Sequence, residues 1–230
     1  MRLLLIGAVL PAALLMLWVY RQDTVEKESP RLILKLVLLG ALSCLPASIL
    51  EGIFTPLIEN VFAEGTPSYT FLLAFFVVAL VEEGCKLFML YKGVYRNPEF
   101  NYRFDGIVYS VAVSMGFAAL ENVTYALGYG AEVLVSRGLL SIPGHATFGV
   151  FMGLFFSQSK MAELYSNGVG RRRNLTAALI APLLLHGIFD YCLMSGSTGL
   201  TLLFFGFVIL MDILSIRLVR IQSKNDRPIA

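Results

Sequence analysis

Apolar residues dominate the chain in seven long runs that short polar connections separate. The runs cover residues 3–20, 32–50, 69–92, 105–127, 139–158, 175–194 and 199–217. A helix of about 20 apolar residues crosses the hydrocarbon core of a bilayer, and each run is close to that length or longer. The pattern therefore predicts an all-α, polytopic integral membrane protein with about seven transmembrane helices, built as a single domain over residues 1–230.

The composition supports a bilayer environment for these helices. Hydrophobic residues make up 57% of the chain and charged residues only 15%, against about 45–50% and 25% in soluble domains. The first run follows Arg2 and is longer than the core of a signal peptide, with no clear small-residue cleavage site after it, so we interpret it as a retained span.

Basic residues predict the orientation of the chain in the membrane. They gather in every second connection and in the C-terminal tail: Arg21, Lys27, Arg31, Lys92, Arg96, Arg103, Lys160, Arg171, Arg172, Arg173, Arg217, Arg220, Lys224 and Arg227. The other connections contain only Arg137. Because cytoplasmic loops are enriched in Lys and Arg, we expect the N-terminus outside and the C-terminus in the cytoplasm. We expect no nucleic-acid partner, and an outer loop over residues 51–68 with an amphipathic segment at 53–62.

Three charged side chains interrupt the run 69–92, namely Glu82, Glu83 and Lys86. Each charge at membrane depth costs roughly 2.5–3.5 kcal/mol. Glu82 and Lys86 are four residues apart and share a helix face, whereas Glu83 lies about 100° around the helix. Lys86 can therefore compensate one carboxylate, and we expect this triplet to be functional.

Three later runs carry polar motifs at the same predicted depth, at or slightly outside the bilayer midplane. Their residues are Glu121, Asn122 and Tyr125 on the fourth run, His145 just after Pro143 on the fifth, and His186 and Asp190 on the sixth. The spacing between His186 and Asp190 lets the carboxylate orient the imidazole ring. One site built by four helices is the simplest interpretation, because membrane helices rarely bury so many ionisable groups for packing alone.

Glutamates with histidines are typical of sites that activate water for attack on a carbonyl group. In this reading Asn122 could stabilise the oxyanion. A second reading makes His145, His186 and Glu121 or Asp190 the ligands of a divalent metal such as zinc, with one position open for water. The chain has no HExxH motif, so both the metal-free and the metal-dependent hypotheses stay open.

Other classes of protein fit the same buried charges. A small proton-coupled transporter or channel would use Glu, His and Lys as a proton relay, although the chain lacks the paired halves typical of transporters. A non-catalytic binding or immunity protein is a third hypothesis. The cysteines Cys44, Cys85 and Cys192 lie in apolar runs without a CxxC motif, as buried structural thiols do.

The four motifs in this order resemble the PrsW family of bacterial membrane proteases. The resemblance covers residues 69–194 and rests on Glu82-Glu83-x-x-Lys86, Glu121-Asn122-x-x-Tyr125, His145-x-x-x-Gly149 and His186-x-x-x-Asp190. The family is distantly similar to CAAX prenyl proteases and bacteriocin-immunity (Abi) proteins. This chain departs from the CAAX pattern at Glu121, where that family has histidine.

The resemblance implies a multi-pass protease of the bacterial cell membrane that makes the first, site-1 cut in a single-span anti-sigma factor during envelope stress. It implies that Glu82 or Glu83 activates water, with Glu82 favoured. His145 and His186 would act as second base, oxyanion donor or metal ligand. The implied supporting residues are Lys86, Glu121, Asn122 and Asp190.

Overall fold

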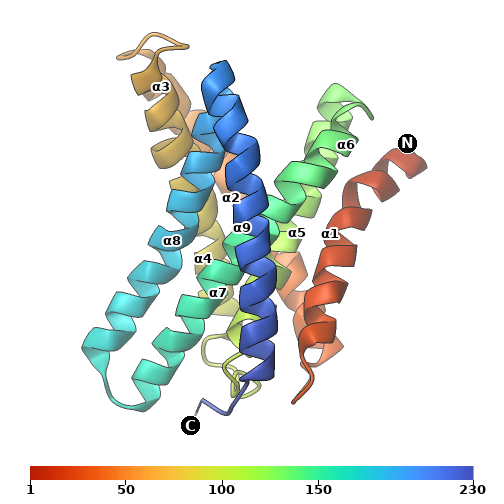
Figure 1. Ribbon diagram of the computed structural model, residues 1–230, viewed down its shortest axis with the longest axis vertical. Coiled ribbons are helices and arrows are strands. Elements are labelled where there is room, and N and C mark those ends of the chain that lie inside the picture. The colour runs from red at the N-terminus through yellow and green to blue at the C-terminus, as the bar shows by residue number, and fades with distance from the viewer. Residues whose placement is uncertain (230) are drawn as a thin grey trace.

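The computed structural model describes residues 1–229 as an elongated bundle of helices (Figure 1). The elements are α1 (Arg2–Gln22), α2 (Pro30–Glu59), α3 (Pro67–Leu72), η1 (Leu73–Ala79), α4 (Leu80–Val94), α5 (Asp105–Tyr129), α6 (Val133–Ser136), η2 (Arg137–Ser141), α7 (Ile142–Leu164), α8 (Gly168–Met194) and α9 (Thr198–Lys224). The all-α fold is confirmed. Ala230, the last residue of the predicted domain, lies outside the described residues, and the single-domain organisation stays a prediction.

Six helical segments within residues 1–229 are long and apolar enough to cross a membrane: α1, α2, α5, the segment Val133–Leu164, α8 and α9. The run 69–92 instead forms α3, η1 and α4 in direct succession, and η1 is a π-helix. The chain termini lie at opposite ends of the bundle (Figure 1). The connections 23–29, 95–104 and 165–167 lie at the C-terminal end, which we call the basic end. The count of seven spans and their orientation stay predictions.

The predicted loop beginning at residue 51 was wrong, because α2 continues to Glu59. The helix passes through Pro46 and Pro56, each of which removes a backbone hydrogen bond. If the chain left the helical conformation in an apolar environment, many more backbone N–H and C=O groups would lose their hydrogen bonds, and no water is there to replace them. The helix therefore continues past both prolines. Glu51 therefore lies on a helix rather than in a loop, and it faces the interior of the bundle.

The helix α5 packs closely against α2 through two glycines. A Cβ atom at Gly116 would lie 1.9 Å from the carbonyl oxygen of Val37, and one at Gly40 would lie 1.9 Å from that of Val113. Small residues let transmembrane helices approach at backbone distance, where van der Waals contacts replace the hydrophobic effect. This contact holds α5, which carries Glu121 and Asn122, next to α2.

At the basic end, the connection between α1 and α2 is tied to α5 by a buried glutamate. Glu28 is 4% exposed and accepts a hydrogen bond from the hydroxyl of Tyr109. The hydroxyl of Tyr20 donates to the Glu28 backbone carbonyl at 2.9 Å. Burial raises the pKa of the Glu28 carboxyl to about 7, and the hydrogen bond from Tyr109 opposes that rise.

We expect Gly116→Ala to destabilise the protein by roughly 1–3 kcal/mol, because α5 and α2 would have to separate. Gly128→Ala is the matched control on the same helix, since its added Cβ meets nothing within 4 Å. The control should be neutral or stabilising by up to about 1 kcal/mol. Thermal unfolding in detergent measures both, and equal midpoints for the two variants would contradict the close contact.

Glu28→Gln should make the protein less sensitive to pH. Because the folded pKa of Glu28 lies above its unfolded value, the folded state holds more protons between about pH 4.5 and pH 7. Stability from this carboxyl is therefore full at low pH and declines as pH rises through 7. Between pH 5 and pH 8, wild type should lose roughly 1–2 kcal/mol more than Glu28→Gln. Thermal midpoints at both pH values measure this, with the exposed Glu26→Gln as a control that should behave as wild type.

Candidate active site in the membrane

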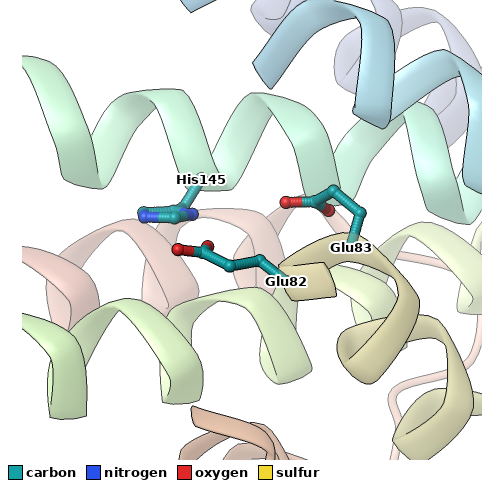
Figure 2. Close-up of side chains that lie close together, drawn as sticks. All are labelled: Glu82, Glu83 and His145. Atoms are coloured by element: carbon teal, nitrogen blue, oxygen red, sulfur yellow. The ribbon is translucent and has the colours of Figure 1, made fainter. Parts of the chain in front are cut away.

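The buried ammonium of Lys86 lies at the centre of the candidate site. Its Nζ is 3.0 Å from Glu82 Oε2, 2.7 Å from Glu83 Oε1 and 3.1 Å from His145 Nδ1. Lys86 and Glu83 are fully buried, and Glu82 is 5% exposed. Figure 2 shows both carboxylates of α4 pointing toward the helix that carries His145. The spacing of three and four residues on α4 thus lets one ammonium neutralise two carboxylates at once.

His145 connects this centre to a second ion pair near the N-terminal end of α7. Its Nε2 lies 3.0 Å from Glu121 Oε2, and Arg137 Nη2 lies 2.7 Å from the same oxygen. Arg137 also donates from Nε to Asn122 Oδ1 at 2.7 Å, and Asn122 Nδ2 donates to the carbonyl of Ala8 at 2.9 Å. Asn122 therefore holds Arg137 and α1 through its side-chain hydrogen bonds.

His186 extends the network in the other direction, onto α8. Its Nδ1 lies 3.0 Å from Glu83 Oε1, and its Nε2 lies 3.3 Å from Asp190 Oδ2. The ring stacks on Phe148, with 4.7 Å between ring centroids. The carboxylate of Asp190 is thus placed to orient His186, at the spacing noted in the sequence.

The donor rules define the protonation of His145. An ammonium has only donors, so Lys86 must donate to Nδ1, and Nε2 then carries the proton that is donated to Glu121. His186 instead has a carboxylate oxygen near each nitrogen, in hydrogen-bond geometry with Glu83 at Nδ1 and only at ion-pair distance from Asp190 at Nε2. The two histidines are therefore in different chemical situations although their ring centroids are 5.5 Å apart.

The π-helix η1 sets the position of the glutamates relative to α8. A π-helical turn inserts an extra residue and turns the following side chains around the helix axis, and such turns are frequent at functional sites. Phe75 of η1 packs on Gly187, where an added Cβ would meet the ring at 2.4 Å. This contact brings η1 against the turn of α8 that carries His186, next to Glu83.

A cavity of about 420 Å³ lies beside the network. Its wall includes Glu82, His145 and His186, whereas the fully buried Glu83 and Asn122 do not line it. The remaining wall comes from α2, η1, α5, α6, η2, α7 and α8. It includes Thr124, Tyr125, Leu193 and Met194, which lie toward the end opposite the basic end, so we infer that the cavity opens on that side. Glu82 and Glu83 are the two glutamates that the sequence proposes as the base, and only Glu82 is accessible from this cavity.

Two charged residues of the cavity wall, Arg137 and Glu51, are not among the site residues proposed from the sequence. The sequence pattern explains Arg137 only as a weak topology signal and places Glu51 in a loop. Arg137 is the one basic residue in the connections predicted to lie on the outer side of the membrane. The positive-inside rule does not explain a cation there, so its position could have indicated a site residue. Glu51 carried no comparable signal, since the end of α2 was misplaced.

A compact donor group for a metal is formed by Glu82, Glu83 and His145, whose candidate ligand atoms lie within 4.8 Å of one another. It shares only His145 with the set proposed from the sequence. His186 and Glu121 lie outside the group and contact its members Glu83 and His145. Carboxylate and imidazole suit zinc. However, the Lys86 ammonium lies within 3.1 Å of an atom of each donor residue, so the present arrangement does not fit a divalent cation together with Lys86.

A helical membrane bundle with glutamates and histidines beside a cavity is the arrangement expected of a membrane-embedded hydrolase. The sequence model of the PrsW family, described as intramembrane metalloproteases, matches residues 28–215. Proteins named Protease PrsW from Geobacillus kaustophilus and Halalkalibacterium halodurans are 36% and 32% identical, over 84% and 97% of this chain and 80% and 99% of theirs. The one from Bacillus subtilis is 32% identical over 81% of both chains.

The chain therefore belongs to the PrsW family and is an intramembrane peptidase, a multi-pass protein of a bacterial membrane. The resemblance predicted from the four motifs is confirmed. No solved structure matches the chain.

Lys86→Met should destabilise the protein by roughly 3–5 kcal/mol, because two buried carboxylates would lose their counter-charge. Lys92→Met is the control, since Lys92 is exposed on the same helix and should change stability by less than about 0.5 kcal/mol. Thermal unfolding in detergent measures both variants. Adding Glu83→Gln to Lys86→Met should recover part of the loss, and no recovery would contradict the charge balance described above.

Proposed function

We propose that the protein makes the site-1 cut in a membrane-anchored anti-sigma factor on the outer side of the membrane, as the first step of a response to envelope stress. The observation that carries this proposal is the exposure of the Glu82 carboxylate to a cavity directed away from the basic end. By the positive-inside rule, that direction is outward. A single-span substrate would enter the cavity with its outer segment.

Glu82 is the general base of the proposed reaction. Its Oε2 is held by Lys86 while the side chain still lines the cavity. Glu82 takes a proton from a water molecule, whose oxygen attacks the carbonyl carbon of the scissile peptide bond. The same carboxyl then gives that proton to the leaving amine nitrogen as the C–N bond breaks. Such positioned proton transfer is typically worth about 10²- to 10⁴-fold in rate.

The other residues of the network hold charge and position around Glu82. Glu83 holds Nδ1 of His186, which lines the cavity. Its Nε2–H makes no hydrogen bond to Asp190 in this arrangement and donates to the oxyanion of the tetrahedral intermediate. His145 accepts from Lys86 and is itself held by Glu121, so it fixes the ammonium that orients Glu82. Asn122 acts further out, by holding Arg137.

The mechanism we propose needs no metal ion. The positive charge that two adjacent carboxylates require is already supplied by Lys86, whose ammonium contacts all three donor residues of the candidate metal group. We derive no step through a metal, although the family is described as one of metalloproteases.

Glu82→Gln should lower cleavage by at least about 100-fold, because the amide cannot accept the proton from water. His186→Ala should also abolish most cleavage, while Glu64→Gln in the exposed connection between α2 and α3 should leave it unchanged. The measurement is cleavage of a single-span anti-sigma factor by purified protein in detergent. Full activity in both site variants, with folding intact, would reject the proposed site.

The same assay distinguishes the metal-free from the metal-dependent mechanism. After exhaustive chelation, wild-type cleavage should continue at the untreated rate. Loss of cutting that added zinc restores would instead assign Glu82, Glu83 and His145 as ligands and would require Lys86 to move.

A further inference from the structure

Four carboxylates line the cavity, and one of them differs from the others in its surroundings. The four residues are Glu51, Glu82, Glu121 and Asp190. Glu82, Glu121 and Asp190 each have a side-chain oxygen 2.7–3.3 Å from a basic nitrogen, of Lys86, Arg137 and His186 respectively. Glu51 forms no hydrogen bond or ion pair through its side chain with any of residues 1–229. It is the cavity carboxylate left without a cation.

Charges of both signs act on Glu51 through space. The carboxylates of Glu82 and Glu121 disfavour its negative charge. Lys86 and His186 favour it, but both are already engaged with other carboxylates at 2.7–3.3 Å. A carboxylate that is partly removed from water and beside two others is unfavourable unless a cation or hydrogen-bond donor joins it. The position therefore favours a positively charged guest over a neutral or negative one.

The position of Glu51 along the bundle axis gives its approximate displacement from Glu82, the proposed general base. Ala47 packs in one cluster with Val81, the residue before Glu82. Glu51 is one helical turn further along α2, so it lies about 6 Å closer to the open side of the cavity. An extended peptide advances about 3.3 Å per residue, and 6 Å corresponds to about two residues.

We propose that Glu51 is a specificity-determining residue, which binds the side chain of a Lys or Arg of the substrate about two residues from the scissile bond, on the side facing the open end of the cavity. The inference rests on the proposed peptidase function and adds the chemistry of one subsite to it. The ligand is recognised by charge and by hydrogen bonds from its ammonium or guanidinium to the carboxylate.

The test measures binding separately from cleavage. Synthetic single-span peptides of one sequence carry Lys, Arg, Met or Glu at successive positions of the outer segment. Binding to Glu82→Gln protein in nanodiscs should be about tenfold tighter for Lys or Arg than for Met at one position. This preference should disappear in Glu82→Gln/Glu51→Gln and shift to the Glu peptide in Glu82→Gln/Glu51→Lys. Glu82→Gln/Glu59→Gln, with its second change at an exposed site on the same helix, should keep it.

The outcomes separate this inference from the proposed function. A missing preference for Lys or Arg at every position, or a preference that survives Glu51→Gln, overturns the role of Glu51 even if wild type cuts the peptides. A preference that depends on Glu51, in a protein whose wild type never cuts, supports the cation subsite and rejects the peptidase mechanism. Thermal unfolding of each variant verifies that the bundle is intact.

Discussion

The protein depends on one buried ammonium, that of Lys86, which no water can reach. It neutralises Glu82 and Glu83 on its own helix and donates to His145 on α7. Charges in an apolar bundle are stable only when nearly every polar atom has a partner, so this one group constrains the relative positions of α4 and α7. The remaining helices complete the charge balance around it.

The network encloses one of the two adjacent glutamates of α4 and leaves the other at the cavity. Glu83 is enclosed between Lys86 and His186, whereas Glu82 keeps one side toward the cavity. This difference follows from their adjacent positions on one helix, which point about 100° apart. Two neighbouring glutamates thus differ in access to the cavity, which supports the proposed role of Glu82 as the general base.

The charged residues of the cavity wall are of two kinds: those paired within the protein, and Glu51, which we propose binds the substrate. Arg137 is committed to Glu121 and Asn122, and it lies over the ring of Tyr125 at 3.8 Å. Glu51 has no such commitment. A membrane protein retains an uncompensated carboxylate only at a cost, and function is the usual reason for that cost. The charge pattern of the wall therefore supports recognition as well as hydrolysis.

Hydropathy predicted the helical membrane fold, because the need to satisfy every backbone group in a bilayer acts on each segment locally. Spacing along single helices likewise predicted that Lys86 serves Glu82 and that Asp190 orients His186. The break into a π-helix at Leu73–Ala79, the joint burial of Lys86 with His145, and the presence of Glu51 in the cavity came only from the tertiary structure. Contacts between helices depend on close packing, as at Gly116, and on ion pairs between residues far apart in the sequence. Close packing and long-range ion pairs produce no periodic pattern in the sequence, so they could not be predicted from it.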